Sequence, residues 1–202
     1  MDKLSYAIGM SIGQNLTGAG VKEINYDDFI KGVKVIFDGT DPAISVDYAN
    51  QVLKTYFEKV QKEKSATEVK ERENQLKKSE EYLKENATKE GIQVTASGLQ
   101  YKVIKEGEGQ KPSAHSRVTV HYEGKLPDGS VFDSSYQRGN PATFGLDQVI
   151  AGWTEGLQLM SEGSTYEFTI PPQLGYGEVG VPGHIPGNSV LIFKVELIKI
   201  AQ

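Results

Sequence analysis

Cysteine is missing from the 202-residue sequence, which excludes disulfides, a thiol nucleophile and cysteine-based zinc sites. An excess of basic charge is missing as well, because 22 Lys and Arg stand against 27 Asp and Glu, and both signs occur along the whole chain. We therefore expect no binding to nucleic acid or to a membrane. The first residues, MDKLSYAIGM, lack the basic start and continuous apolar run of a signal peptide. The expectation is a cytoplasmic protein, with the periplasm or cell surface as the alternative if a signal peptide has been removed.

Standard catalytic signatures are also lacking. The sequence has no GxSxG nucleophile motif, no GxxxxGK[ST] phosphate loop and no HExxH zinc motif. Its histidines, His115, His121 and His184, are far apart and have no partners at metal-ligand spacing, so we expect neither a metal site nor a cofactor. A carboxylate pair for glycoside hydrolysis stays open, although nothing in the sequence context favours it.

The composition itself is ordinary for a soluble globular protein, with 38% hydrophobic and 24% charged residues. It changes near residue 90, because 16 of the 22 glycines and seven of the eight prolines follow that point. The first half is therefore predicted to be helical and the second to consist of strands and turns. Apolar residues at helical spacing predict helices at 4–16 and 26–38, the second capped by Asn25. A third helix is predicted to begin after Pro42, with Ser45 as its N-cap, and to run unbroken to about residue 90.

The helical half divides by its apolar content. The first two helices are too short to enclose a core, so residues 1–60 are predicted to need oligomerisation. Beyond residue 60 the apolar residues become sparse and charged residues dominate. Residues 61–90 are therefore predicted to be the exposed continuation of a long linking helix, with a helix lying on the second domain as the alternative.

Residues 91–202 are predicted to form an α+β domain. A short helix is expected near 149–160, and Pro127-Asp128-Gly129 predicts the tight turn of a hairpin. Alternating or continuous apolar residues predict strands at 99–103, 118–122, 166–170 and 190–200. An antiparallel sheet wrapped around a single helix fits this pattern.

Several aromatic residues of this half stand where packing demands are weak. Trp153 comes at the start of the predicted helix, Phe132 is next to Asp133, and Tyr176 lies in a loop rich in Pro and Gly. Most aromatic side chains simply fill cores. These positions nevertheless indicate an aromatic pocket rimmed by a few polar groups.

Five ordered motifs in this half resemble the FKBP-type peptidyl-prolyl cis-trans isomerases. They are VTVHYEG (118–124), GSVFDSS (129–135), QVIAGWTEGL (148–157), LGYG (174–177) and LIFKVEL (191–197). Segments outside these five motifs also resemble the bacterial two-domain branch of the family, the macrophage infectivity potentiator-like branch: DKLSYAIG (2–9), EYLKEN (81–86) and SGLQY (97–101).

The resemblance implies a two-domain isomerase. Residues 1–60 would be a helical dimerisation domain that joins two chains into a homodimer, and residues 91–202 would be the catalytic domain, an antiparallel sheet half-wrapped around a short helix. The implied substrates are proline-containing polypeptides, macrolide FKBP inhibitors are expected to bind, and the family needs no cofactor. Rotation about an Xaa-Pro bond costs ~18–20 kcal/mol and requires neither a nucleophile nor a proton transfer.

The resemblance also implies the residues of the pocket. Trp153 would form the floor beneath the proline ring, the Tyr176 hydroxyl and the Ile150 backbone N–H would donate to substrate carbonyls, and Asp133 would act electrostatically and order the pocket. The implied catalytic residues are Tyr122, Phe132, Asp133, Trp153, Tyr176 and Phe193, and those binding substrate or inhibitor are Phe144, Val149, Ile150 and Ile185. The rim departs from the usual family pattern at Val181, His184 and Gly187, which leaves the preferred residue before proline open.

Two other functions remain alternatives. A dimeric holdase chaperone, or a protein-binding module with an incidental isomerase pocket, would need the same aromatic domain but no catalysis. A partner-binding adaptor would use the apolar stripe of residues 1–60. The intact aromatic set favours the isomerase, which would act on unfolded or nascent chains during protein folding.

Overall fold

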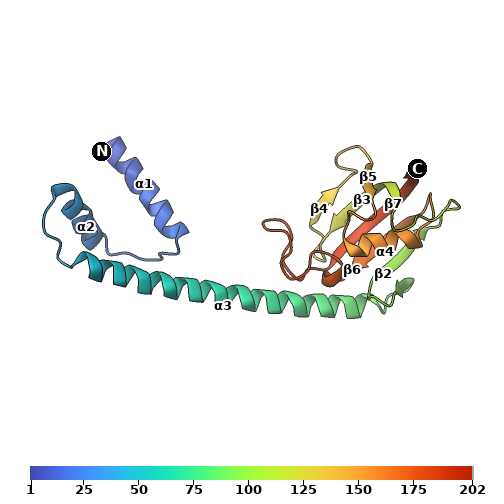
Figure 1. Cartoon of the computed structure of the whole chain (residues 1–202), viewed down its shortest axis with the longest axis horizontal. Helices are drawn as coiled ribbons and strands as arrows, with labels where there is room; N and C mark the ends of the chain where they lie inside the picture. Colours follow the sequence, from blue (N-terminus) through green and yellow to red (C-terminus); the bar gives the residue numbers. More distant parts are fainter. Residues whose placement is uncertain (202) are drawn as a thin grey trace. The chain divides into compact units, whose positions relative to one another are not determined.

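The computed structural model describes residues 1–201, which form two compact units, residues 1–68 and residues 69 onward. Helices α1 (Lys3–Gly18) and α2 (Tyr26–Asp38) belong to the first unit. Helix α3 (Val46–Asn86) is continuous and contributes to both units (Figure 1). The single long helix predicted for this region is therefore confirmed, although it ends a few residues earlier than expected.

Helix caps fix the start of each helix in the first unit. The side chain of Asn25 accepts the N–H of Asp28 at 3.1 Å, and that of Ser45 accepts the N–H of Tyr48 at 3.2 Å. Both caps were predicted from the sequence. Such caps satisfy N–H groups that have no partner within the helix.

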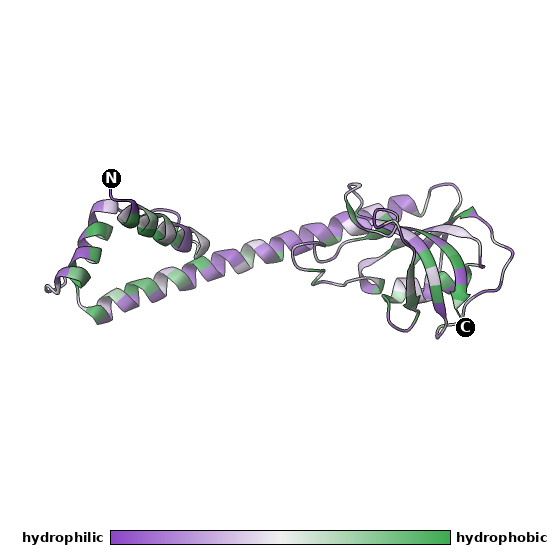
Figure 2. Cartoon of the chain, turned by 90° about the horizontal axis from the view of Figure 1, so that it is seen from above, coloured by the Kyte–Doolittle hydropathy of each residue, from purple (hydrophilic) through white to green (hydrophobic). Residues whose placement is uncertain are grey.

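The first unit leaves its apolar side chains uncovered. No residue of α1 or α2 is buried, and Ile36 and Phe37 are 80% and 86% exposed. An apolar groove of about 430 Å³ is lined by residues of both helices, including Ile12, Phe29 and Val33. Figure 2 shows the apolar residues along these helices and along the beginning of α3. The expectation that these helices enclose no core of their own agrees with this exposure.

The second unit is built on one antiparallel sheet. Its seven strands are β1 (Ile92–Val94), β2 (Gln100–Lys105), β3 (Arg117–Lys125), β4 (Val131–Ser134), β5 (Ala142–Gly145), β6 (Thr165–Ile170) and β7 (Leu191–Ala201). The strand order is β1-β2-β6-β7-β3-β4, and β5 also pairs with β3. All pairings are antiparallel, and β7 lies inside the sheet, between β6 and β3. The strands β1 and β5 were not predicted.

Helix α4 (Ala151–Leu159) packs closely on this sheet. Two of its glycines make the close approach possible: a Cβ on Gly152 would lie 2.5 Å from the side chain of Ile170, and one on Gly156 would lie 2.7 Å from the ring of Phe168. Leu157 of the helix and Phe168 of the sheet are fully buried in the resulting core. The α+β architecture expected from the sequence is confirmed.

The end of α3 differs from the exposed segment predicted over residues 61–90. Ser79 and Asn86 are buried. The side chain of Asn86 donates to the Gln100 Oε1 of β2 at 2.9 Å, and the Gln100 side chain donates to the carbonyl of Leu83 at 2.8 Å. Small polar side chains make this contact, so the scarcity of apolar residues in the sequence did not reveal it.

Candidate active site

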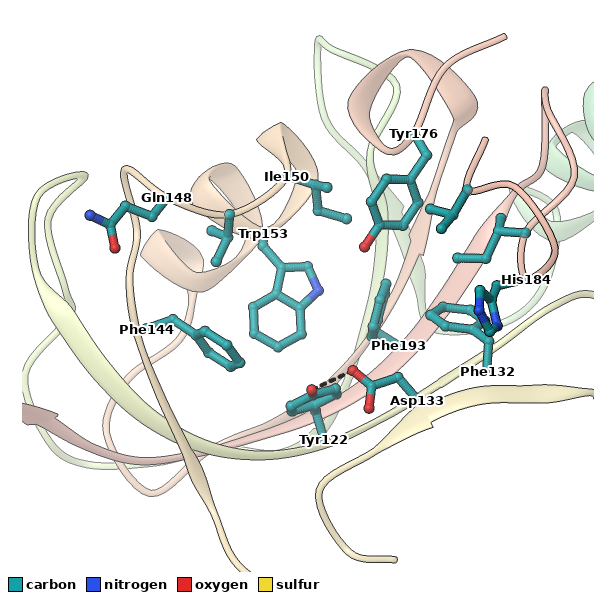
Figure 3. Close-up of a pocket in the computed structure, with 13 residues that line it drawn as sticks. Tyr122, Phe132, Asp133, Phe144, Gln148, Ile150, Trp153, Tyr176, His184 and Phe193 are labelled. Atoms are coloured by element: carbon teal, nitrogen blue, oxygen red, sulfur yellow. Dashed lines mark hydrogen bonds between the residues drawn. The ribbon is translucent and has the colours of Figure 1, made fainter. Parts of the chain in front are cut away.

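A cavity of about 580 Å³ opens beside α4 in the second unit (Figure 3). Its walls come from the strands β3, β4, β5 and β7, the start of α4 and the loop before β7. The lining residues are Tyr122, Phe132, Asp133, Phe144, Gln148, Val149, Ile150, Trp153, Tyr176, Val181, His184, Ile185 and Phe193. All ten residues that the sequence implied for a pocket are therefore brought together, while their chemical roles stay predictions.

Aromatic rings arranged edge to face form most of the lining. The Trp153 indole contacts the rings of Tyr122, Phe144 and Phe193 at centroid distances of 5.1, 5.6 and 5.2 Å, each nearly perpendicular to it. Phe132 meets Phe193 in the same way at 5.4 Å. This geometry favours aromatic pairs, because the positive edge of one ring lies on the negative face of the next. The cavity is consequently a preformed apolar site whose rings hold one another in place.

The Trp153 indole lies at the bottom of this arrangement and is 4% exposed. It sits in the first turn of α4, where the N-cap residue Ile150 has extended backbone angles. Its Nε1 is the one buried side-chain nitrogen or oxygen in residues 1–201 that has no hydrogen-bond partner. The floor of the cavity is therefore aromatic, with the unpaired indole N–H of Trp153 as its polar atom.

One wall of the cavity is polar. The Tyr122 hydroxyl donates to Asp133 Oδ2 at 2.5 Å, and Arg138 donates both to Asp133 Oδ1 and, at 2.8 Å, to the Tyr122 oxygen. Burial alone would raise the pKa of Asp133, but the hydrogen bonds from Tyr122 and Arg138 outweigh it and hold that pKa below its ordinary value. Burial, together with the hydrogen bond to Asp133, raises the pKa of Tyr122. Near neutral pH the wall thus contains a carboxylate, a neutral phenol and a guanidinium.

Sequence reasoning missed Arg138 in this wall. The residue lies in the turn after β4, its side chain is half exposed, and its guanidinium stacks over the Tyr122 ring with 5.5 Å to the centroid. The only available signal was chemical: a carboxylate expected at the edge of an apolar pocket needs a counter-charge, and Arg138 is the nearest basic residue that follows Asp133 in the chain. Gln148, which lines the cavity mouth, was missed as well.

The rim is formed by the loop that precedes β7. The Tyr176 hydroxyl points into the cavity (Figure 3), and burial together with the charge of Asp133 raises its pKa. Val181 and Ile185 close a small hairpin, which places His184 at the mouth of the cavity. Two of the three rim positions that depart from the family pattern, Val181 and His184, therefore do line the site.

Two other features are absent from residues 1–201. In the part of the chain that the structure describes, no group of three His, Asp or Glu side chains is close enough to share a metal ion. None of the helices in that same part combines the length and the apolar character needed to cross a membrane.

Comparison with known proteins gives matches along the whole chain. The description "FKBP-type peptidyl-prolyl cis-trans isomerase" matches residues 108–198, and "Domain amino terminal to FKBP-type peptidyl-prolyl isomerase" matches residues 1–103. The FKBP-type 22 kDa peptidyl-prolyl cis-trans isomerase of Escherichia coli K12 is 44% identical over 97% of this chain and 93% of its own length. Outer membrane protein MIP of Legionella longbeachae is 43% identical over 100% of this chain and 86% of its own length. The crystal structure of FkpA from Escherichia coli matches with a TM-score of 0.80 and 36% identity, covering 98% of this chain and 95% of that one.

Proposed function

The chain belongs to the FKBP-type peptidyl-prolyl cis-trans isomerases, and we propose that it accelerates rotation about Xaa-Pro bonds in the aromatic cavity around Trp153. The family and its reaction rest on the comparisons, which favour the isomerase over a binding module with an incidental pocket. One observation supports the assignment of the site: edge-to-face rings form an aromatic floor beside a single polar wall.

An apolar site suits this reaction because of how the amide changes during rotation. The planar amide is stabilised by resonance and has a polar carbonyl, whereas the twisted amide has lost conjugation and part of that polarity. Moving the bond from water into a dry aromatic cavity therefore costs the planar state more than the twisted one. Catalysis follows from this difference, since only interactions that are stronger in the transition state lower the barrier.

Polar groups at the edge of the cavity would orient the substrate. The Tyr176 hydroxyl points inward from the rim, and Ile150 presents its backbone at the start of α4. In our proposal both donate to substrate carbonyls, one on each side of the proline. Asp133, tied to Tyr122 and Arg138, holds the Tyr122 ring against Trp153 and places negative charge beside the twisting carbonyl group.

The experiment that tests this site is NMR exchange on short Xaa-Pro peptides, with and without a macrolide FKBP inhibitor. We expect faster cis-trans exchange that the inhibitor abolishes, since both ligands would occupy the same cavity. Varying the residue before proline would show what His184 and Val181 contribute at the rim. Catalysis that is insensitive to the inhibitor and unchanged in Trp153→Ala would contradict the assignment of the cavity.

We also propose that two copies of this chain associate through their N-terminal helices. The support is the uncovered apolar surface of α1 and α2, together with the match of residues 1–103 to the domain found amino-terminal to the isomerase. Monomeric proteins rarely leave a contiguous apolar surface of this kind exposed. Sedimentation equilibrium tests the proposal, and a monomer at micromolar concentration would contradict it.

The compartment needs revision relative to the sequence-based expectation. The comparisons do not support the cytoplasmic location, and one relative bears the name outer membrane protein. We therefore propose the alternative, the periplasm or the cell surface. Fractionation of cells that express the full natural gene product would decide this, because recovery in the cytoplasmic fraction alone would contradict it.

A further inference from the structure

The loop that carries the pocket rim ends at an unusual residue. Asn188 is the one non-glycine residue between residues 1 and 201 with a positive φ, at +58°, and it is 7% exposed. It lies between the rim residue Ile185 and the start of β7. Asparagine tolerates this left-handed conformation better than most residues, yet the surrounding structure has to hold it there.

Three hydrogen bonds hold Asn188, and they point in different directions. Its backbone N–H donates to the carbonyl of Gly177 at 2.8 Å. Its carbonyl accepts the hydroxyl of Ser79 at 2.6 Å, and its side-chain amide donates to the carbonyl of Arg72 at 3.3 Å. The last two partners belong to the part of α3 that lies in the same compact unit as the sheet. Asn188 therefore joins the two ends of the rim loop and fastens them to a helix.

The rim loop between these ends has little freedom of its own. Gly177 directly follows Tyr176, whose carbonyl accepts the N–H of Gly180 at 3.1 Å. At the other end, Ser189 donates its hydroxyl to the carbonyl of Pro186 at 2.8 Å. A Cβ on Gly187 would lie 1.9 Å from the carbonyl oxygen of Glu178, so the two arms of the loop touch along their backbones. A substitution that loosens Asn188, where the two ends of the loop meet, should therefore displace Tyr176 and Ile185.

On the helix side, the contact between Ser79 and Asn188 is buried, and α3 is itself held on the sheet. Ser79 is 2% exposed, so its hydroxyl is shielded from water, and the bond to Asn188 has no solvent competitor. About one and two helical turns further on, Leu83 and Asn86 hold α3 to Gln100 of β2. The helix is thus anchored on the sheet independently of the rim loop, and it can serve as a fixed support for that loop.

We propose that Ser79 and Asn188 are positioning residues for the isomerase reaction, acting through the rim loop to hold Tyr176 and Ile185 over the cavity. Neither residue lines the cavity. The proposal rests on the cavity being the isomerase site. It makes the last turns of α3 a working part of the catalytic unit, although the sequence favours an exposed linker there and leaves a helix lying on the second domain as the alternative.

Replacement of Ser79 by Ala in the full-length protein tests the proposal, because it removes only the hydroxyl that holds the Asn188 carbonyl. The loss of one buried hydrogen bond should lower kcat/KM for Xaa-Pro peptides and weaken binding of a macrolide FKBP inhibitor, each about two- to tenfold. Amide hydrogen exchange should become faster in residues 176–189 and stay unchanged in α4. Ser65→Ala, an exposed serine on the same helix, is the matched control.

A second variant separates positioning from general stability. Asn188→Gly keeps the left-handed backbone and both backbone hydrogen bonds but loses the bond to Arg72, so its effects should have the same pattern as those of Ser79→Ala and be smaller. Kinetics and exchange equal to those of the Ser65→Ala control would overturn the proposal. Exchange that becomes faster throughout the sheet would overturn it as well, since the role would then be structural only. Full activity in Trp153→Ala would show separately that the cavity is not the isomerase site.

Discussion

The two compact units differ in how their apolar side chains are covered. In the second unit the sheet and α4 bury residues such as Leu99, Leu157 and Phe168 completely. In the first unit no residue of α1 or α2 is buried, although both helices carry apolar stripes. Because burial of apolar surface is the main favourable term in folding, the second unit is complete within one chain and the first is not. The second unit, which is covered, holds the cavity proposed for the reaction, and the first unit, which is uncovered, is the part proposed to join two copies.

The largest expected effect is on the core of the second unit. Replacing Phe168, which is fully buried against α4, by Ala should lower the free energy of unfolding by about 3–5 kcal/mol. Denaturant titration followed by Trp153 fluorescence measures this, since the single Trp of the chain lies in that unit. Phe37→Ala is the matched control, because its ring is 86% exposed and it should leave the Trp153 transition unchanged. Equal losses in both variants would mean that the two units do not differ as described.

Removal of the pocket carboxylate should affect catalysis and leave the first unit untouched. In Asp133→Ala the Tyr122 hydroxyl and Arg138 lose a charged partner, and kcat/KM for Xaa-Pro peptides should fall about ten- to hundredfold. Sedimentation should stay as in the wild type. Asp128→Ala, in the exposed turn between β3 and β4, is the control. Unchanged acceleration in Asp133→Ala would remove this residue from the mechanism.

Local periodicity and motif order were enough to predict most of this architecture. The caps Asn25 and Ser45 were recognisable because they depend on residues within one helical turn. The strands β2, β3, β6 and β7 were recognisable by their apolar pattern, whereas β1 and β5 are too short, at three and four residues, to establish a period. The ten cavity residues came from the resemblance to the family, and eight of them lie within its motifs. They lie on five separate elements and intervening loops that only the fold brings together.

Contacts made by exposed or small polar residues were not predictable in this way. Arg138 reaches Asp133 and Tyr122 because the turn after β4 folds back, which no periodic pattern encodes. Ser79 and Asn86 are buried on a helix whose composition is that of a solvent-exposed one. Their burial depends on hydrogen-bond partners more than ten residues away in sequence, and a polar residue in a charged helix carries no sign of such a partner.

A charge in the groove of the first unit should separate the two copies without slowing the reaction. Ile36→Glu places a carboxylate among apolar residues that the proposed second copy would cover, so the dimer dissociation constant should rise about tenfold or more. Isomerisation of short peptides, per catalytic unit, should stay unchanged. Lys34→Glu introduces an acidic charge on the same helix outside the groove and serves as the control. A dimer that Ile36→Glu leaves intact would place the interface elsewhere.

A smaller effect is expected at the N-cap of α2. Asn25→Ala leaves the N–H of Asp28 without its side-chain acceptor and should cost about 1 kcal/mol of helix stability. If α2 is completed by a second copy, this loss should appear as a roughly fivefold weaker dimer, while the Trp153 unfolding transition does not move. Asn25→Asp keeps an acceptor at the same position and should restore the affinity. A shift of the Trp153 transition in Asn25→Ala would contradict the independence of the two units.

The smallest effect is expected from pH, and it concerns the polar wall of the cavity. The pKa of Asp133 in the folded protein is held below the ordinary 3.8, so its contribution to stability is fully present above that value and is lost as pH falls through the lower, folded pKa. The pKa of Tyr122 is raised above 10.0, so its hydroxyl stays a donor throughout the neutral range.

The difference in unfolding free energy between wild type and Asp133→Asn should therefore be constant from about pH 8 to pH 5 and shrink only in more acid solution. Denaturant titrations at a series of pH values measure it, and a change between pH 5 and 8 would show that a group other than Asp133 is responsible.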